Sequence, residues 1–197
     1  MKSKYTHKDI LTLPNSRLRE KSAKVHVITD ETLQLIDNML AATLDWENSR
    51  PHEMAVALAA VQIGALERVI IIREDFENKE NQNFIVLINP EIVKKEGKII
   101  DDFPEGCLSV RDVYGLVPRY EKVRVKALDV QGREVRLKSP NPFVARILQH
   151  EVDHCNGKCF VDHIAHDKNA FSILTAKGDL EPIEYAKVVK MGILLDE

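Results

Sequence analysis

The sequence predicts an α+β fold, in which small antiparallel sheets pack around one central helix. Three observations lead to this class. Short segments of apolar or alternating residues, separated by turn residues, fill the middle of the chain. A capped helix around residue 150 follows most of these segments, and a longer amphipathic helix precedes them. We expect one domain over residues 1–197, with a variable tail from about residue 163.

The N-terminal part is expected to contain a short extended piece, a turn at Pro14-Asn15 and one helical turn within residues 9–22. Thr29-Asp30 can cap a helix that continues from Glu31 to Trp46. A polar loop over residues 47–53 is expected to be exposed and mobile. One face of the helix carries its apolar side chains, which are Leu33, Ile36, Met39, Leu40 and Leu44.

The strands are predicted from apolar runs and from alternation. A polar stretch over residues 75–83 joins the first two strands as a loop. Apolar runs predict strands over Val69–Ile72 and Phe84–Ile88. Residues alternate weakly over 91–101 and around Val113–Val117, and clearly over Lys122–Val130. A turn at Gln131-Gly132 then leads into a strand over Glu134–Leu137.

The tail is less regular than the rest of the sequence. A strand is predicted over Ala170–Thr175, a turn over residues 177–179 and a helix over Glu184–Met191. The apolar residues 192–195 are expected to pack back on the domain rather than to dock on a partner.

The central helix is predicted to begin at Asn141-Pro142 and to end at Asn156-Gly157, where cap, proline and glycine suit the helix ends. Because His150 and His154 are four residues apart, their imidazoles lie on one face and can hold one metal ion. Glu151 is close enough to that ion to take a proton from a bound water. This His-Glu-x-x-His pattern is typical of hydrolytic metal enzymes and favours a central metal-binding helix over a surface helix with two solvated histidines.

Two histidines leave a catalytic ion one protein ligand short. A metzincin would have a third histidine at position 160, where this chain has Phe160, so that class does not fit. The better candidate is Cys107, because the glycine before it allows backbone and sulfur to approach an ion closely. The predicted metal ligands are therefore Cys107, His150 and His154.

Three motifs, in this order, resemble those of the peptide deformylase family. They are Ala-Leu-Ala-Ala-Val-Gln-Ile-Gly at residues 57–64, Glu-Gly-Cys-Leu-Ser at 105–109 and Gln-His-Glu-Val-Asp-His at 149–154. The resemblance extends from about Ile10 to Asp162. It implies an enzyme that removes the formyl group from the N-terminal formyl-methionine of new polypeptides and releases formate. It also implies ferrous iron, with zinc or nickel as possible ions in the purified protein.

The same resemblance implies roles for further residues. The side-chain amide of Gln62 and the backbone N–H of Leu108 would stabilise the oxyanion, and Glu151 would act as general base and then as general acid. On the predicted helix, three residues lie one or two turns before His150 and can face the same cavity. The predicted substrate-binding residues are Val56, Ala57, Leu58, Glu105, Gly106, Phe143, Arg146 and Ile147.

Two features depart from the family pattern. Ala55 and Ala57 stand where the family has glycines, and we expect a negative φ at both, with the methyl group of Ala57 crowding the cleft. Arg146 stands where the family has an apolar pocket residue. We expect its guanidinium to extend to the rim and pair with Glu53 or Asp112, rather than to form a charged pocket floor. Glu105 is expected to pair with Arg119.

Composition limits the remaining possibilities. Hydrophobic residues make up 44% and charged residues 30%, as in globular proteins, and the net charge of −3 argues against direct binding of nucleic acid. The sequence shows neither the apolar segment of a signal peptide nor an apolar run of membrane-spanning length, so we expect a cytoplasmic protein and no membrane partner. Cys155 and Cys159 are expected to be small apolar core residues rather than a second metal site.

The expected partners are N-formylmethionyl nascent peptides, and the ribosome near its exit tunnel is a candidate. Two alternatives remain open. One is a related metallo-hydrolase, either a deacylase of other N-acyl peptides or an aminopeptidase. The other is a non-catalytic relative that binds peptides, although Glu151 and Gln62 argue against it because neither is needed to hold an ion.

Overall fold

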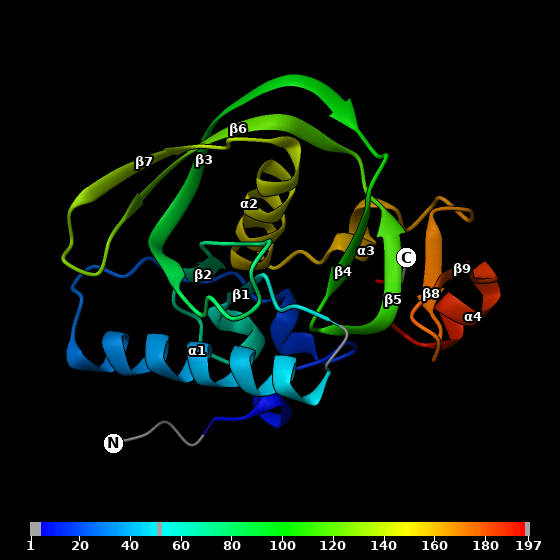
Figure 1. The fold of residues 1–197 in the computed structure, drawn as a ribbon, viewed down its shortest axis with the longest axis horizontal. Coiled ribbons are helices and arrows are strands. Elements are labelled where there is room, and N and C mark those ends of the chain that lie inside the picture. The colour runs from blue at the N-terminus through cyan, green and yellow to red at the C-terminus, as the bar shows by residue number, and fades with distance from the viewer. Residues whose placement is uncertain (1–4, 51–52, 196–197) are drawn as a thin grey trace.

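A computed structural model describes residues 5–50 and 53–195 of the chain (Figure 1). The helices are α1 (Asp30–Ser49), α2 (Pro142–Cys155), α3 (Phe160–His163) and α4 (Tyr185–Lys190), with 3-10 turns at His7–Asp9, Ser16–Arg19 and Ala60–Ile63. The strands are β1 (Ala57–Ala59), β2 (Val69–Arg73), β3 (Phe84–Ile100), β4 (Pro104–Cys107), β5 (Val110–Leu116), β6 (Arg119–Leu128), β7 (Glu134–Lys138), β8 (Phe171–Leu174) and β9 (Leu180–Pro182).

The strands form two antiparallel sheets, one with the order β1-β2-β3-β6-β7 and one with the order β4-β5-β8-β9. Figure 1 shows α2 at the centre, with β3 and β6 arching over it and α1 lying across the opposite side. Helix α2 packs on β6 and β1, whereas α1 packs on β1, β2 and the 3-10 turn after β1. The predicted α+β class, with small antiparallel sheets around a central helix, is confirmed.

Strand β3 is longer than the sequence indicated. Two separate segments were expected, but one strand runs from Phe84 to Ile100 and its pairing with β6 shifts register three times. The first shift lies between Ile88 and Glu91, where Asn89 has a φ of 55° and Pro90 lacks a backbone N–H. These two residues interrupt the alternation in the sequence but bend the strand without ending it.

Helix α1 also differs from the prediction. It extends to Ser49, so residues 47–49 are helical, and Glu47 is buried rather than part of an exposed loop. Pro51 and His52 of the predicted loop lie outside the described residues. The buried face is also rotated relative to the predicted one, because Leu33 is 41% exposed. The apolar residues buried on this face are Leu35, Ile36, Met39 and Ala42.

In the described parts near both ends of the chain, the predicted helical turn, strand and last helix are present, whereas β9 was not predicted. A 3-10 turn at Ser16–Arg19 lies where one helical turn was expected. In the tail, β8 pairs with β5, β9 closes a hairpin on β8, and α4 follows. Ile193 is 6% exposed and packs on the domain, whereas Leu195 is 59% exposed. No helix within the described residues is long and apolar enough to cross a membrane.

Candidate active site

Three metal-ligating side chains converge where β4 meets α2. Nε2 of His154 lies 3.3 Å from Sγ of Cys107 and 3.2 Å from Nε2 of His150, and the three ligand atoms all lie within 4.8 Å of one another. Ligand atoms around a tetrahedral ion, with bonds of about 2.0 to 2.3 Å, are roughly 3.5 Å apart. The predicted set of Cys107, His150 and His154 is therefore brought together, and both its spacing and its donor chemistry fit one metal ion.

The caps predicted for α2 explain how its histidines are placed. The side chain of Asn141 accepts a hydrogen bond from the backbone N–H of Val144 at 2.9 Å, Pro142 takes the first turn, and Gly157 has a φ of 73°. The helix therefore presents His150 and His154 one turn apart on its buried side, with exposures of 8% and 0%.

A carboxylate beside the ligands orients the ring of His150. Nδ1 of His150 lies 2.8 Å from Oε1 of Glu105, so Nε2 faces the other two ligands. Arg119 grips the same carboxylate with two hydrogen bonds, from Nε at 2.8 Å and from Nη2 at 3.0 Å. The predicted pairing of Glu105 with Arg119 is thus confirmed. Burial opposes ionisation of Glu105, but hydrogen bonds from His150 and Arg119 hold its pKa well below the usual range.

Arg146 does not extend to the rim as predicted. It is 4% exposed, and Nη1 donates to Oε2 of Glu105 at 3.2 Å. The prediction failed because helical spacing shows which side of α2 the residue occupies, but not that a carboxylate from β4 lies within reach. The acids predicted to pair with it, Glu53 and Asp112, both pair with Arg50 instead, at 2.8 Å each.

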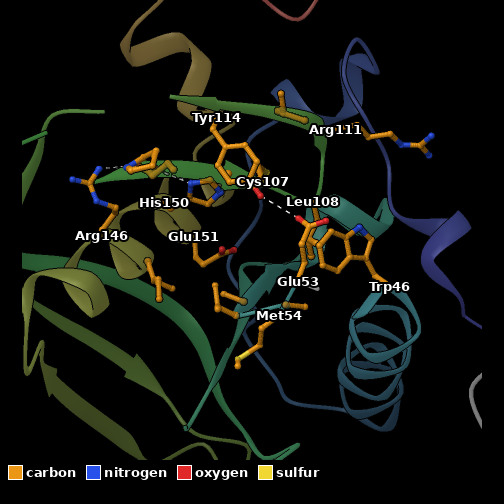
Figure 2. Close-up of a pocket in the computed structure, with 18 of the residues that line it drawn as sticks. Trp46, Glu53, Met54, Cys107, Leu108, Arg111, Tyr114, Arg146, His150 and Glu151 are labelled. Carbon is orange, nitrogen blue, oxygen red and sulfur yellow. Dashed lines mark hydrogen bonds and ion pairs between the residues drawn. The ribbon is translucent and has the colours of Figure 1, made fainter. Parts of the chain in front are cut away.

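Glu151 has the properties of a general base. Figure 2 shows its carboxylate pointing into the pocket beside His150. The residue is 4% exposed, and its Oε2 has no hydrogen-bond partner within the described parts of the chain. Burial raises the pKa of Glu151 to about 7. This carboxyl group is therefore buried beside the ligand set and faces the pocket, where it could exchange a proton with a bound molecule.

Gln62 is oriented by its own local structure. It lies in the 3-10 turn after β1, and its Oε1 accepts the backbone N–H of Ala59 at 2.8 Å. Its amide nitrogen must therefore point the other way, where it lies 3.1 Å from Oγ of Ser109 and 3.6 Å from Sγ of Cys107. Leu108 lies between those two residues and lines the same pocket (Figure 2).

A cavity of about 430 Å³ opens beside these groups. Of the predicted substrate-binding residues, seven line it: Val56, Ala57, Glu105, Gly106, Phe143, Arg146 and Ile147. The side chain of Leu58 does not, because alternation along β1 turns it into the core under α1, where it is 0% exposed. That assignment to the cavity wall is corrected.

The sequence did not identify several residues that line the cavity. Phe103 lies edge-on to Phe143 at 5.8 Å, and Tyr114 donates from its hydroxyl to Oε2 of Glu53 at 3.1 Å. Leu180 reaches the cavity from β9, far along the chain. Phe103 and Tyr114 flank the Glu-Gly-Cys-Leu-Ser motif in the sequence and could have been considered, whereas Leu180 comes from a strand far along the chain.

The chain is similar in sequence and in fold to proteins of one family of metal-dependent hydrolases. Residues 7–170 match the family model described as polypeptide deformylase. A peptide deformylase from Halothermothrix orenii is 44% identical over 147 residues, which cover 75% of this chain and 86% of the relative. One from Thermomicrobium roseum is 41% identical over 158 residues, covering 79% and 84% of the two chains. The crystal structure of a peptide deformylase from Legionella pneumophila superposes with a TM-score of 0.67 at 40% identity and covers 78% of this chain and 83% of that one.

Proposed function

Because the chain belongs to the peptide deformylase family, we propose that it removes the formyl group from the N-terminal formyl-methionine of newly made polypeptides and releases formate. The observation that carries this proposal is the buried carboxyl group of Glu151 beside the Cys107, His150 and His154 ligand set, facing a cavity. Holding an ion does not require such a group, whereas hydrolysis of an amide does.

Each residue has a separate task in this reaction. Cys107, His150 and His154 would hold the ion, which when bound supplies a Lewis acid that makes water nucleophilic at neutral pH. Glu151 takes a proton from the water that attacks the formyl carbon, and later returns it to the amine nitrogen when the C–N bond breaks. The amide of Gln62 and the backbone N–H of Leu108 donate to the formyl oxygen as it becomes negative. One water and one formyl-peptide thus give one formate and one free amino terminus.

We propose ferrous iron as the working ion, with zinc as the alternative. One thiolate with two imidazoles suits iron, zinc and nickel alike, so the donor set alone does not distinguish them. Oxidation of the iron or of Cys107 would inactivate the site. Metal analysis after anaerobic purification, together with activity per bound ion, tests the choice. Full activity with zinc alone would overturn it.

The function is tested by formate release from formyl-Met-Ala with iron-loaded protein, compared with turnover of acetyl-Met-Ala and free Met-Ala. Faster cleavage of the formyl peptide supports the proposal. Preference for the acetyl or free peptide would instead indicate another deacylase or an aminopeptidase, and no turnover of any of the three would indicate a non-catalytic binder.

We propose that the protein meets its substrates close to where they are made. Formyl-methionine begins chains as they leave the ribosome, so we place the protein in the cytoplasm, near the exit tunnel, and expect residues 1–197 to act as one domain. Co-sedimentation with ribosomes that carry formylated nascent chains measures that association, and its absence would leave only released chains as substrates.

We expect the side chain of the formylated first residue of the substrate peptide to bind against apolar residues of the cavity. Phe143, Ile147 and Val56 line the cavity, and the charge of Arg146 is already met by Glu105. A formyl-norleucine peptide should therefore have a kcat/KM at least about 100-fold above that of the formyl-glutamate peptide, because burial of an unpaired carboxylate costs several kcal/mol. A competition assay measures the ratio, and a preference for glutamate would show that the pocket offers a cation to the substrate.

Ala57→Gly is expected to raise kcat/KM on formyl-Met peptides by about tenfold, or roughly 1.4 kcal/mol. Ala57 lines the cavity on β1, which is an edge strand open to pairing with a substrate backbone. Positive φ values among the described non-glycine residues occur only at Asn89 and Asp112, so the predicted negative φ at Ala55 and Ala57 is confirmed. The backbone at Ala57 therefore accepts a Cβ without strain, and crowding of the cleft by the methyl group remains the prediction that Ala57→Gly tests.

Ala55→Gly is the matched control for this prediction. Ala55 also lines the cavity, but it lies further from Gln62 along the chain, and its backbone N–H and C=O are bound by Glu47 and Arg73. The exchange should therefore change kcat/KM by about threefold or less. A change within about twofold for Ala57→Gly would show that both alanines are neutral replacements.

A further inference from the structure

Arg146 is a buried cation on α2, and among the described residues its guanidinium donates to acceptors that all lie outside this helix. Nη1 donates to Oε2 of Glu105 at 3.2 Å and to the carbonyl oxygen of Val117 at 2.7 Å, and Nη2 donates to the carbonyl oxygen of Ile100 at 3.2 Å. With an exposure of 4%, the side chain is held in one place by these partners.

These acceptors mark the place where the two sheets meet. Ile100 is the last residue of β3, in the five-stranded sheet, and Glu105 belongs to β4, in the four-stranded sheet. Val117 lies in the connection from β5 to β6, which passes from one sheet to the other. Arg146 therefore joins both sheets to α2, one helical turn before the ligand His150.

The same guanidinium completes the set of donors around Glu105. Oε1 of Glu105 meets His150 and Arg119, while Oε2 meets Arg119 and Arg146. Arg119 is shared, because its Nη1 also donates to Asp153 at 2.5 Å. Arg146 approaches from α2, the helix that also carries His150 (Figure 2), so its hydrogen bond fixes the carboxylate of Glu105 relative to that helix.

We propose that Arg146 is a positioning residue for the metal site, which sets the carboxylate of Glu105 against Nδ1 of His150 and so fixes the direction in which Nε2 points. This inference rests on the metal site of the proposed function. It explains a buried charge beside the apolar wall residues Phe143 and Ile147, because that charge serves the ligand shell and only the aliphatic stem of Arg146 is left for the substrate.

The test uses Co²⁺ as a probe in the full chain. Arg146→Met removes the charge but keeps an unbranched apolar stem, and it should weaken Co²⁺ binding about tenfold, as loss of a residue behind a metal ligand typically does. The visible absorption bands of the bound Co²⁺ should also shift, because the direction of His150 changes. Arg146→Lys, which can still donate to Glu105, should recover most of the affinity.

Arg68→Met is the matched control. Arg68, which directly precedes β2, is also buried. It donates to the carbonyl oxygens of Pro90 at 2.9 Å and of Cys155, the last residue of α2, at 3.2 Å, and to Oδ1 of Asn156 at 2.8 Å, and none of these bonds involves Glu105. The Arg68→Met variant should have a lower free energy of unfolding than the wild type, but the absorption spectrum of its bound Co²⁺ should be unchanged. If Arg146→Met binds Co²⁺ within about twofold of the wild type with an unchanged spectrum, Arg146 is only structural and the proposal is wrong. Formate release from the wild type is measured separately, so that failure of the deformylase activity is distinguished from failure of this inference.

Discussion

Replacement of Glu151 with glutamine is expected to lower kcat on formyl-Met peptides by about a thousandfold, or roughly 4 kcal/mol of barrier, while metal binding is retained. Glutamine has nearly the same shape but cannot accept a proton. Glu151 is not one of the three converging ligands, and its Oε2 is left without a partner among the described residues. Both the activation of water and the protonation of the leaving amine should therefore fail together.

The measurement pairs steady-state formate release with metal content of the same sample. Unchanged metal content with lost activity supports the role of Glu151 as base. Activity within about tenfold of the wild type would contradict it. A variant that loses its ion together with its activity would show that Glu151 helps to hold the metal, as expected of a binder rather than a catalyst.

Glu47→Ala is expected to lower the free energy of unfolding by about 3 to 5 kcal/mol, because it leaves a buried cation unpaired. Oε2 of Glu47 accepts Nη2 of Arg73 at 2.5 Å and the backbone N–H of Ala55 at 3.0 Å. The side chain of Arg73 is 0% exposed and that of Glu47 is 4% exposed. The pair is thus shielded from bulk water, and without the carboxylate the charge of Arg73 is not solvated as it would be at the surface.

Denaturant unfolding of the metal-free protein measures this loss, with Asp37→Ala as the control on the same helix. Asp37 also carries a carboxylate but is exposed, so its removal should change the free energy of unfolding by about 0.5 kcal/mol or less. Combining Glu47→Ala with Arg73→Met should recover part of the loss, since the unpaired charge is then gone. A loss below about 1 kcal/mol for Glu47→Ala would show that the buried pair contributes little.

The sequence predicted best what depends on local spacing. The caps of α2 and the four-residue separation of His150 and His154 follow from helix geometry, and both agree with the structure. Cys107 could not be found by helical spacing, because it lies on β4 and not on α2. Its assignment rested on the preceding glycine and on the Glu-Gly-Cys-Leu-Ser motif.

The failures have a common physical cause. Glu47 and Arg146 are polar, and a sequence pattern places polar residues in water unless a partner is known. Their partners, Arg73 and Glu105, come from strands that only the tertiary fold brings near. For the same reason the cavity wall formed by Leu180 could not be predicted, since it depends on how β9 joins a sheet that begins at β4.

The position of the three ligands has a consequence for the folding equilibrium. Cys107 belongs to the four-stranded sheet, whereas His150 and His154 lie on the helix that packs against the five-stranded sheet. An ion held by all three is a reversible cross-link between the two sheets. By mass action, each tenfold excess of free metal over its Kd adds about 1.4 kcal/mol to the free energy of unfolding. A shortage of metal therefore lowers the fraction of active molecules and, at the same time, the resistance of the whole chain to unfolding and proteolysis.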